Sequence, residues 1–340
     1  MIKVSIMITC YNCEACIDNA INSVIVQDMP FEWELLIGDD GSRDNTVSHV
    51  NEWINKYPNN IKLFILPRDI NEKKDGTRAA KNRANLLEKA KGEYLIFLDG
   101  DDCFLGTEKI REQVKILDNP AFKKCSCVAH NIVANDIVNE KKYAMTPDEI
   151  ESGIVNSKKY WKEMYFHTNT ILFRNSCKKT MLDIKYRNFL NDNFITYIIL
   201  QKGAIYYINK LWAQYNLTGE GLWTGKNRVY GCFRNLILYD LEIRLNQDME
   251  SESFIRHLYD FRYILTNYLS ADKSAVMPLV EHLNIEDFPF TWLLYRFDDE
   301  LTAEEKKDKD KLCSKVSFIF TINRLFHVPK KLKEIIRKRR

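Results

Sequence analysis

The first hundred residues alternate between short apolar runs and segments whose apolar residues recur every three or four positions. Short apolar runs bounded by turn residues are typical of buried strands, and the longer spacing is typical of helices. The expected strands cover residues 4–8, 34–37, 61–66 and 94–98, and the expected helices 17–25, 47–57 and 79–90. This alternation predicts right-handed βαβ units, hence an α/β, Rossmann-like fold with a mostly parallel sheet and helices on both faces.

The alternation becomes less regular beyond residue 105 and gives way to helical spacing beyond residue 228. Further strands are expected at 126–133, 170–173 and 204–208, and helices at 193–200, 236–245, 254–269 and 276–283. The highly charged segment 300–311 is expected to be a solvated linker or an exposed helix face. We therefore expect an α/β domain over residues 1–225 and a helical C-terminal region over 226–340.

Composition narrows the classes of partner. Apolar residues make up 45% of the chain and charged residues 29%, which is typical of a globular protein with a core. The net charge of only +3 argues against a broad basic face, so no nucleic-acid partner is expected. The N-terminal residues have no long apolar region or cleavage site, and no apolar stretch reaches 18 residues. We expect neither a signal peptide nor a membrane-spanning helix.

Nine cysteines in a chain without a secretory signal predict reduced thiols in a cytoplasmic protein. Cys10, Cys13 and Cys16 have the C-x2-C-x2-C spacing that also occurs in iron–sulfur proteins. No Cys-Pro pair follows, and Cys10 would end a strand while Cys16 would begin a helix. We expect no iron–sulfur cluster and no zinc site.

Acidic residues follow two of the expected strands. The second strand leads into Asp39-Asp40-Gly41-Ser42-Arg43-Asp44, and the fourth into Asp99-Gly100-Asp101-Asp102. In a parallel sheet, ligands bind at the carboxyl ends of the strands. Carboxylates there suit Mg²⁺ or Mn²⁺, which prefer oxygen ligands and can bridge a diphosphate. The alternative is a surface turn, because Asp and Gly are also common turn residues.

The usual nucleotide-binding motifs are absent. No G-x-G-x-x-G follows the first strand, and the chain lacks G-x-x-x-x-G-K-[ST], which argues against a dehydrogenase or a P-loop NTPase. The first strand leads instead into Thr9-Cys10-Tyr11-Asn12. Tyr11 could stack on a base while Asp40 accepts a hydrogen bond from an imide N–H. Alternatively, Tyr11 simply packs at the rim of the sheet.

Taken together, these segments resemble the family 2 glycosyltransferases. The resemblance rests on Val4–Asn12, Gln27, Asp39–Asp44, Ala80-Lys81-Asn82, Gly92-Glu93-Tyr94 and Leu98–Asp102, in that order. It covers residues 1 to about 105 and continues weakly to about 225. It implies a GT-A fold and an inverting, metal-dependent transfer of a hexose or N-acetylhexosamine from a nucleotide sugar.

The resemblance implies roles for residues of the donor site. Tyr11 and Asp40, with Thr9 beside them, would hold the nucleobase, usually uracil. Lys81 stands where the family more often has arginine, so Arg78, one helical turn earlier, could instead contact the diphosphate.

The resemblance also implies the metal site and the base. Asp101 would contact the ribose or the metal, Asp102 would bind the metal, and Asp99 would support them; the cofactor would be Mn²⁺ or Mg²⁺. Asp192, at the start of the helix at 193–200, matches the general base of inverting members, although Asn191 replaces their usual acid. The alternative is that Asp192 only caps its helix.

A glycine-rich segment, Gly219–Gly225, surrounds Trp223 and resembles the flexible loop that closes over the donor in this family. A tryptophan buried in a turn is the alternative. His167 and Arg174 could contact the acceptor or a phosphate.

The last eleven residues are strongly basic. Seven basic residues stand against Glu334 alone: Lys330, Lys331, Lys333, Arg337, Lys338, Arg339 and Arg340. An apolar stretch precedes them, so we expect a basic amphipathic helix on an anionic membrane surface, with a partner-binding helix or a solvated end as alternatives.

The resulting hypothesis is a cytoplasmic enzyme, peripheral at the inner face of the cell membrane. It would transfer sugar from a nucleotide sugar, a UDP-sugar by the resemblance, to a hydroxyl of a glycan or lipid-linked acceptor for a surface polysaccharide. Two alternatives remain: a nucleotidyltransferase, and a non-catalytic subunit that binds a glycan or a partner.

Overall fold

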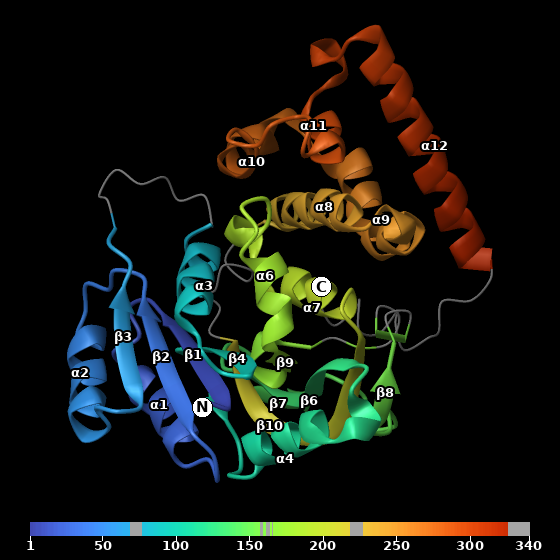
Figure 1. The fold of residues 1–340 in the computed structure, drawn as a ribbon. Helices are drawn as coiled ribbons and strands as arrows, with labels where there is room; N and C mark the ends of the chain where they lie inside the picture. Colours follow the sequence, from blue (N-terminus) through green and yellow to red (C-terminus); the bar gives the residue numbers. More distant parts are fainter. Residues whose placement is uncertain (69–76, 157–158, 161–163, 165, 218–226, 326–340) are drawn as a thin grey trace. The chain divides into compact units, whose positions relative to one another are not determined.

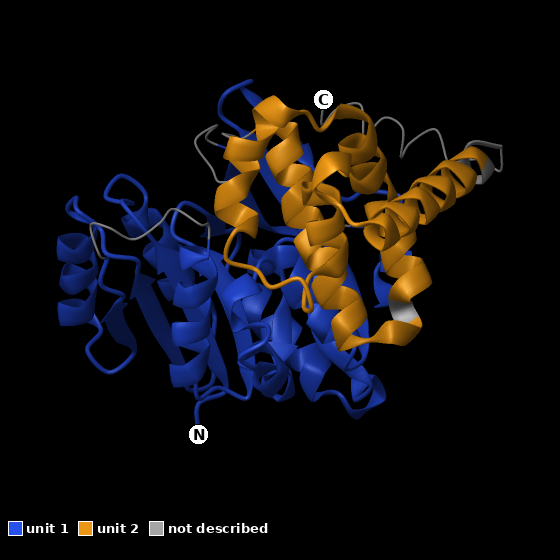
Figure 2. Cartoon of the chain, turned by 90° about the horizontal axis from the view of Figure 1, so that it is seen from above, with its two compact units in different colours: residues 1–224 blue, residues 225–340 orange. Residues whose placement is uncertain are grey.

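The structure, a computed structural model, describes residues 1–68, 77–156, 159–160, 164, 166–217 and 227–325. The chain divides into two compact units, Met1–Thr224 and Gly225–Arg340 (Figure 2).

The first unit begins with the expected βαβ units. Four strands pair in parallel in the order β3-β2-β1-β4 (Figure 1). They are β1 Val4–Cys10, β2 Trp33–Asp39, β3 Ile61–Ile65 and β4 Tyr94–Asp99, connected by α1 Ile17–Ile25, α2 Thr46–Lys56 and α3 Arg78–Lys89. The strands and helices expected over residues 1–100 are therefore confirmed to within about two residues.

The remaining strands of the unit extend this sheet with mixed pairing. In the described residues, the sheet has ten strands and continues from β4 in the order β9-β6-β10-β5. β6 and β10 are parallel, whereas the pairings of β5, β7, β8 and β9 are antiparallel. These strands are β5 Cys103–Phe104, β6 Cys125–Asp136, β7 Lys141–Ala144, β8 Gly153–Val155, β9 Leu172–Arg174 and β10 Ala204–Leu217. The α/β class is confirmed.

Helices α4 Lys109–Asp118, α6 Lys178–Met181 and α7 Asp192–Leu200 accompany this part of the sheet. The sequence pattern predicts α7 but not α4, α6, β5, β7 or β8. Three of these missed elements are strands of two to four residues, too short for a periodicity to develop.

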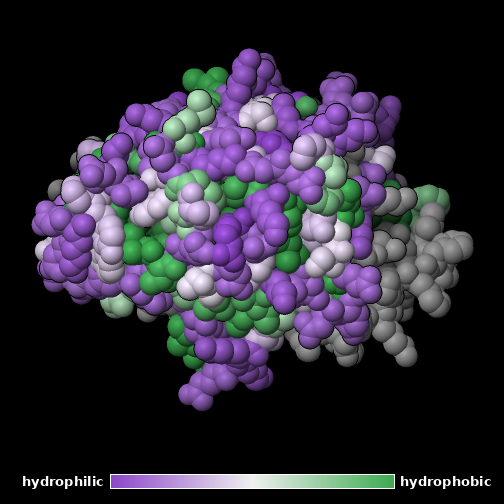
Figure 3. All heavy atoms as spheres, turned by 60° about the horizontal axis from the view of Figure 1, so that its bottom comes forward, coloured by the Kyte–Doolittle hydropathy of each residue, from purple (hydrophilic) through white to green (hydrophobic). Residues whose placement is uncertain are grey.

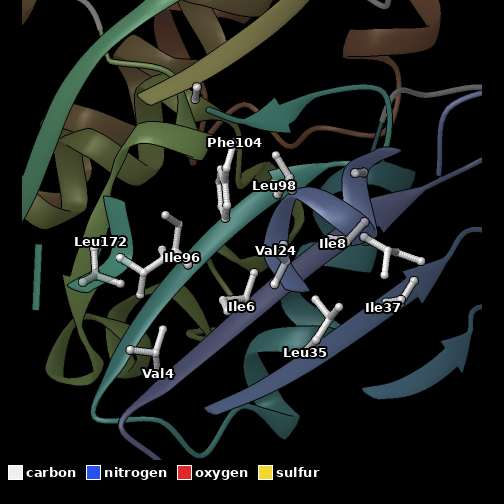
Figure 4. Close-up of a cluster of buried hydrophobic side chains, with 14 of the residues drawn as sticks. Val4, Ile6, Ile8, Val24, Leu35, Ile37, Ile96, Leu98, Phe104 and Leu172 are labelled. Atoms are coloured by element: carbon white, nitrogen blue, oxygen red, sulfur yellow. The ribbon is translucent and has the colours of Figure 1, made fainter. Parts of the chain in front are cut away.

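The main core lies against β1. Val4, Ile6 and Ile8 alternate along β1 and pack with Val24 of α1 and Leu35 of β2 (Figure 4). Successive strand residues point to opposite faces, so one face of β1 supplies these side chains. Complete burial of each contributes roughly 1.5–3 kcal/mol to stability.

On the sheet's other side, glycine permits close packing of α3. A Cβ on Gly38 would lie 2.2 Å from Asn82 Oδ1. Because none is present, Asn82 Nδ2 donates a hydrogen bond to the Gly38 carbonyl at 2.7 Å. This contact fixes α3 over the end of β2. It thereby positions Arg78 and Arg83, which lie on the same helix.

The second unit is helical, as expected. It comprises α8 Arg228–Leu245, α9 Glu250–Asn267, α10 Lys273–Val280, α11 Pro289–Tyr295 and α12 Ala303–Leu325. Most of the charged segment at 300–311 lies in the first turns of α12, which begins at Ala303. Asp240 of α8 accepts hydrogen bonds from the backbone N–H groups of Phe290 and Thr291, and thereby satisfies donors in the first turn of α11.

An ionic cluster is buried between α8 and α9. Glu242 is fully buried, accepts a hydrogen bond from Arg256 at 2.7 Å, and lies 3.4 Å from His257 Nε2. Burial lowers the pKa of His257, but the Glu242 and Asp260 carboxylates outweigh it and raise the pKa above its usual value. His257 is therefore favoured in its charged form.

The face shown in Figure 3 is covered mainly by hydrophilic side chains, with hydrophobic side chains between them. Among the helices that the structure describes, none combines the length and the apolar character needed to cross a membrane. The basic residues 330–340 lie outside the described residues.

Candidate active site

The two acidic clusters meet at one edge of the sheet. Cys10 at the end of β1 is in register with Asp39 on β2, and Thr9 is in register with Asp99 on β4. After Asp99 the chain turns at Gly100, where a Cβ would lie only 2.8 Å from that of Cys10. Glycine therefore lets the turn after β4 pass directly over the end of β1.

Asp99 is fixed by donors from two elements. Thr9 Oγ1 donates to Asp99 Oδ1 at 2.8 Å, and Arg83 Nη2 of α3 contacts both Asp99 oxygens at 3.0 and 3.1 Å. Burial raises the pKa of Asp99, but the positive charge of Arg83, aided by His167, outweighs it and lowers the pKa below the usual value. Asp99 is thus held as a carboxylate.

Asp102 is buried beside Asp99. Its oxygens accept hydrogen bonds at 3.0 Å from Asn169 Nδ2 and from the backbone N–H of Asn216. Burial and the neighbouring Asp101 and Asp99 charges raise the pKa of Asp102 well above its usual value. Additional positive charge at this position would therefore stabilise its ionised form.

Asp101 lies at the exposed side of the same turn. Desolvation and the Asp99 charge raise its pKa. Its backbone carbonyl accepts a hydrogen bond from Asn216 Nδ2 at 2.6 Å, which ties the turn to β10.

His167 lies between three carboxylates. Its Nδ1 is 3.7 Å from Asp102 Oδ2, and its Nε2 is 3.3 Å from Asp192 Oδ2 and 3.9 Å from Asp99 Oδ2. The ring is 3% exposed and stacks on Tyr215, with the ring centroids 4.4 Å apart. Packing therefore fixes the orientation of the imidazole.

Asp192 is the first residue of α7, and its neighbour caps the helix. Asn191 Oδ1 accepts the backbone N–H of Phe194 at 3.1 Å, as an N-cap side chain does. The alternative that Asp192 serves only as the cap is therefore wrong. Its carboxylate instead faces His167 at 3.3 Å, Arg83 at 3.6 Å and Thr168 Oγ1 at 3.5 Å, and the side chain is 18% exposed.

A divalent cation fits one part of this cluster. Asp99, Asp102 and His167 each offer a ligand atom, and these atoms lie within 4.8 Å of one another. Asn169 Oδ1 is buried and lacks a hydrogen-bond partner among the described residues, and the same side chain contacts Asp102. Two carboxylates suit Mg²⁺ and Mn²⁺, and the imidazole nitrogen favours a transition-metal ion over Mg²⁺. Asp101, expected to be a ligand, is not part of this group.

The other acidic cluster forms a separate subsite with Tyr11. Asp40 is buried and receives Arg68 Nη2 and Arg78 Nε, both at 2.7 Å. The Arg68 guanidinium also lies over the ring of the exposed Tyr11, 3.6 Å from its centroid. The structure therefore joins Tyr11 and Asp40 through Arg68.

Arg78 and Lys81 have different surroundings. Besides Asp40, Arg78 donates to the backbone carbonyls of Leu66 and Pro67 at 3.0 and 3.1 Å. Lys81 is half-buried on the same helix. Trp223 and the rest of Gly219–Gly225 lie outside the described residues.

The roles of Arg68, Arg83 and Asn169 were not predicted from the sequence, and His167 was predicted only to contact the acceptor or a phosphate. One feature of the sequence could have indicated Arg83. It is a charged residue directly after Asn82, on the side of an expected helix that faces the sheet. Arg174 has a structural role, because it donates to the backbone carbonyls of Cys125 and Leu117 at 2.9 and 2.8 Å.

Parts of the chain are similar in sequence to known proteins. The profile of glycosyl transferase family 2 matches residues 5–181. A poly(ribitol-phosphate) beta-glucosyltransferase of Bacillus spizizenii is 36% identical over 109 residues, which are 32% of this chain and 16% of the relative. A glycosyltransferase of Haemophilus influenzae is 35% identical over 114 residues, 34% of this chain and 42% of the relative. The chain thus spans less than two thirds of these relatives.

Solved structures share the fold. Residues 1–349 of Staphylococcus aureus TarS, in complex with UDP-GlcNAc, give a TM-score of 0.56 at 19% identity, covering 86% of this chain and 79% of that one. A mannosyltransferase of Pyrobaculum calidifontis, in complex with GDP-Man and Mn²⁺, gives 0.51 at 15% identity, covering 86% and 84%. At these identities the likeness concerns the fold.

Proposed function

The chain belongs to glycosyl transferase family 2, and from that membership we propose that it transfers a sugar, with inversion, from a nucleotide diphosphate donor to an acceptor hydroxyl. The observation that carries the proposal is the connection between Asp99 and Asp192. Arg83 contacts both carboxylates, at 3.0 and 3.6 Å, and His167 lies 3.3 Å from Asp192. A single network thus joins the candidate diphosphate site to the candidate base.

Asp99, Asp102 and His167 would hold the divalent cation. When bound, it neutralises negative charge on the donor diphosphate as that group leaves. Arg83 keeps Asp99 ionised, and Asn169 orients the Asp102 carboxylate. Mn²⁺ is the preferred ion, because the ligand group contains an imidazole.

Asp192 would accept the proton of the acceptor hydroxyl. The neighbouring Arg83 and His167 orient its carboxylate. Asp192 does not cap α7, because Asn191 does so. Attack on the face of the sugar opposite the diphosphate inverts the anomeric centre. A positioned base typically contributes ~10²–10⁴-fold to the rate.

Tyr11 and Asp40 would bind the nucleobase, with Asp40 accepting the imide N–H of uracil. Arg68 and Arg78 each donate to one oxygen of Asp40. A carboxylate offers about four acceptor sites, so Asp40 can still accept the imide N–H while both arginines remain bound. Thr9 supports the site through Asp99, and Trp223 would cover the donor. A uridine donor is further supported by the UDP-GlcNAc complex of TarS, which has the same fold.

The acceptor would be a hydroxyl of a glycan or lipid-linked glycan. This proposal is supported by the poly(ribitol-phosphate) glucosyltransferase of Bacillus spizizenii, to which part of the chain is similar. The basic residues 330–340 would keep the enzyme at the inner face of the cell membrane, where anionic lipids attract Lys and Arg side chains at roughly 1 kcal/mol each.

A thermal-shift panel of nucleotide sugars with Mn²⁺ tests the donor class. A ligand that binds only the folded state raises the melting temperature by mass action. UDP-sugars should raise it, and chelation should remove most of the increase. A panel in which no nucleotide sugar changes the melting temperature at millimolar concentration would contradict the proposal.

A further inference from the structure

Cys13 and Cys16 lie in a tight turn immediately before α1. The backbone N–H of Cys16 donates to the Cys13 carbonyl at 2.9 Å, and that of Ile17 donates to the same carbonyl at 2.8 Å. A turn closed in this way brings its first and fourth Cα atoms within about 7 Å. Disulfides span Cα separations of roughly 4.4–6.8 Å, so a bridge across this turn needs little backbone movement.

The two thiols interact and can be reached by solvent. Both side chains are partly exposed. The neighbouring Cys13 side chain lowers the pKa of the Cys16 thiol. Cys16 also occupies the N-cap position of α1, where the helix dipole favours a thiolate. Cys10 differs, because it is buried and its thiol donates to the Gly38 carbonyl at 3.6 Å.

We propose that Cys13 and Cys16 are a redox-active dithiol that a hydroperoxide oxidises to a disulfide, altering the loop that carries Tyr11. The Cys16 thiolate attacks the peroxide, breaks the O–O bond and becomes a sulfenic acid. The Cys13 thiol then attacks the Cys16 sulfur and displaces the hydroxyl as water. In total, two thiols and one H₂O₂ give one disulfide and two waters, and a dithiol reductant reverses the change.

Formation of this disulfide would alter the loop that carries Tyr11, because the same two thiols donate hydrogen bonds to backbone carbonyls of that loop. Cys13 Sγ donates to the Tyr11 carbonyl at 3.6 Å, and Cys16 Sγ donates to the Cys13 carbonyl at 3.5 Å. Asn12, which lies between Tyr11 and Cys13, has a positive φ of 50°. A disulfide has no S–H group, so both hydrogen bonds are lost, and Tyr11 is freed from one of the contacts that place it. This second part of the inference rests on the proposed donor site.

The bridge can be mapped by cleavage after Glu14, which separates Cys13 from Cys16. The full chain is treated with H₂O₂, its remaining thiols are alkylated, and a glutamyl endopeptidase digests it under non-reducing conditions. Mass spectrometry should find the two flanking peptides joined, with the mass of two hydrogens missing. The joined species should persist in Cys10→Ser and disappear in Cys13→Ser.

The effect on the loop is measured as UDP affinity by titration calorimetry. Oxidation should weaken binding roughly fivefold, which corresponds to one hydrogen bond of about 1 kcal/mol. The Cys13→Ser/Cys16→Ser double variant should bind UDP equally before and after peroxide.

Peptides that are not joined, or joined through Cys10, would overturn the dithiol. A Cys13–Cys16 bridge with unchanged UDP affinity would overturn its effect on the loop. Failure of both redox forms to bind any uridine nucleotide would instead refute the donor assignment and leave the mapped bridge standing.

Discussion

Replacement of Asp192 by asparagine should abolish transfer and leave the fold almost unchanged. The substitution keeps the size and shape of the side chain and removes the charge and the ability to accept a proton. The cap of α7 is unaffected, because Asn191 provides it through Phe194. The candidate cation ligands also remain, since Arg83 keeps its two contacts with Asp99.

The expected magnitudes follow from these contacts. Loss of a general base should lower kcat by ~10²–10⁴-fold with little change in donor affinity. The partly exposed Asp192 loses ion pairs at 3.3 and 3.6 Å, which should change stability by no more than about 1 kcal/mol. Asn191→Ala should show the opposite pattern. Loss of its cap costs about 1 kcal/mol, or roughly 2–4 °C in melting temperature, while most of the activity is retained.

The assay measures release of the nucleoside diphosphate, with and without acceptor, alongside donor affinity by calorimetry and melting temperature for both variants. Transfer by Asp192→Asn within a few-fold of wild type would refute its role as the base. Loss of activity accompanied by an equal loss of donor affinity would also refute it, because that result indicates a donor contact.

Three further predictions concern the metal, the second unit and the C-terminus. Asp102→Asn should raise the Mn²⁺ concentration needed for UDP-sugar binding by at least tenfold, whereas Asp136→Asn, which changes a partly exposed carboxylate outside the candidate site, should not; full turnover in excess chelator would exclude the metal. Because the pKa of His257 is raised in the folded protein, the charged imidazole should stabilise the fold fully below pH 6.5, and this stabilisation should be lost as the pH rises through the folded pKa. His257→Gln should therefore flatten the dependence of the denaturation midpoint on pH in this range, and an equal slope in wild type and variant would disprove the prediction. Deletion of residues 326–340 should reduce co-sedimentation with anionic liposomes at low salt and spare donor hydrolysis; equal co-sedimentation would exclude the membrane role.

A deletion that begins at residue 326 leaves helix α12 complete. The sequence alone suggests removing the whole apolar and basic segment from residue 315. Val316, however, is buried, and Phe320 packs on Tyr259 of α9 with ring centroids 5.6 Å apart. A deletion at 315 would therefore remove part of the helical unit together with the tail.

The fold was predictable where local patterns are long. The runs that became β1, β2 and β4 are flanked by amphipathic helices, and their order along the chain determines a parallel sheet. The two-residue strand β5 was not anticipated, and neither was the antiparallel pairing of β9, a strand that the sequence predicts at 170–173. They are short, and their pairing depends on partners that are distant in sequence, such as Ala213 for Phe104.

The candidate site was predictable only in part for a related reason. Asp99 and Asp102 follow a strand whose end can be located from the sequence. His167 comes from a segment without regular periodicity, and its position beside them arises from tertiary packing on Tyr215. Arg83 carries a charge on a buried helix face, which is interpretable only once Asp99 is known to lie opposite. The roles assigned to these residues stay predictions.

The most direct test of the account is the identity of the products formed from the donor that stabilises the protein most. The reaction is run with Mn²⁺ and an acceptor glycan, and the products are analysed by ³¹P and ¹H NMR. The account predicts release of the nucleoside diphosphate and a transferred sugar whose anomeric configuration is opposite to that in the donor, both absent from Asp192→Asn. Release of pyrophosphate would identify a nucleotidyltransferase, and retention of configuration would exclude Asp192 as the base of an inverting reaction. Binding of a donor without any turnover would contradict the conclusion that the protein is an enzyme.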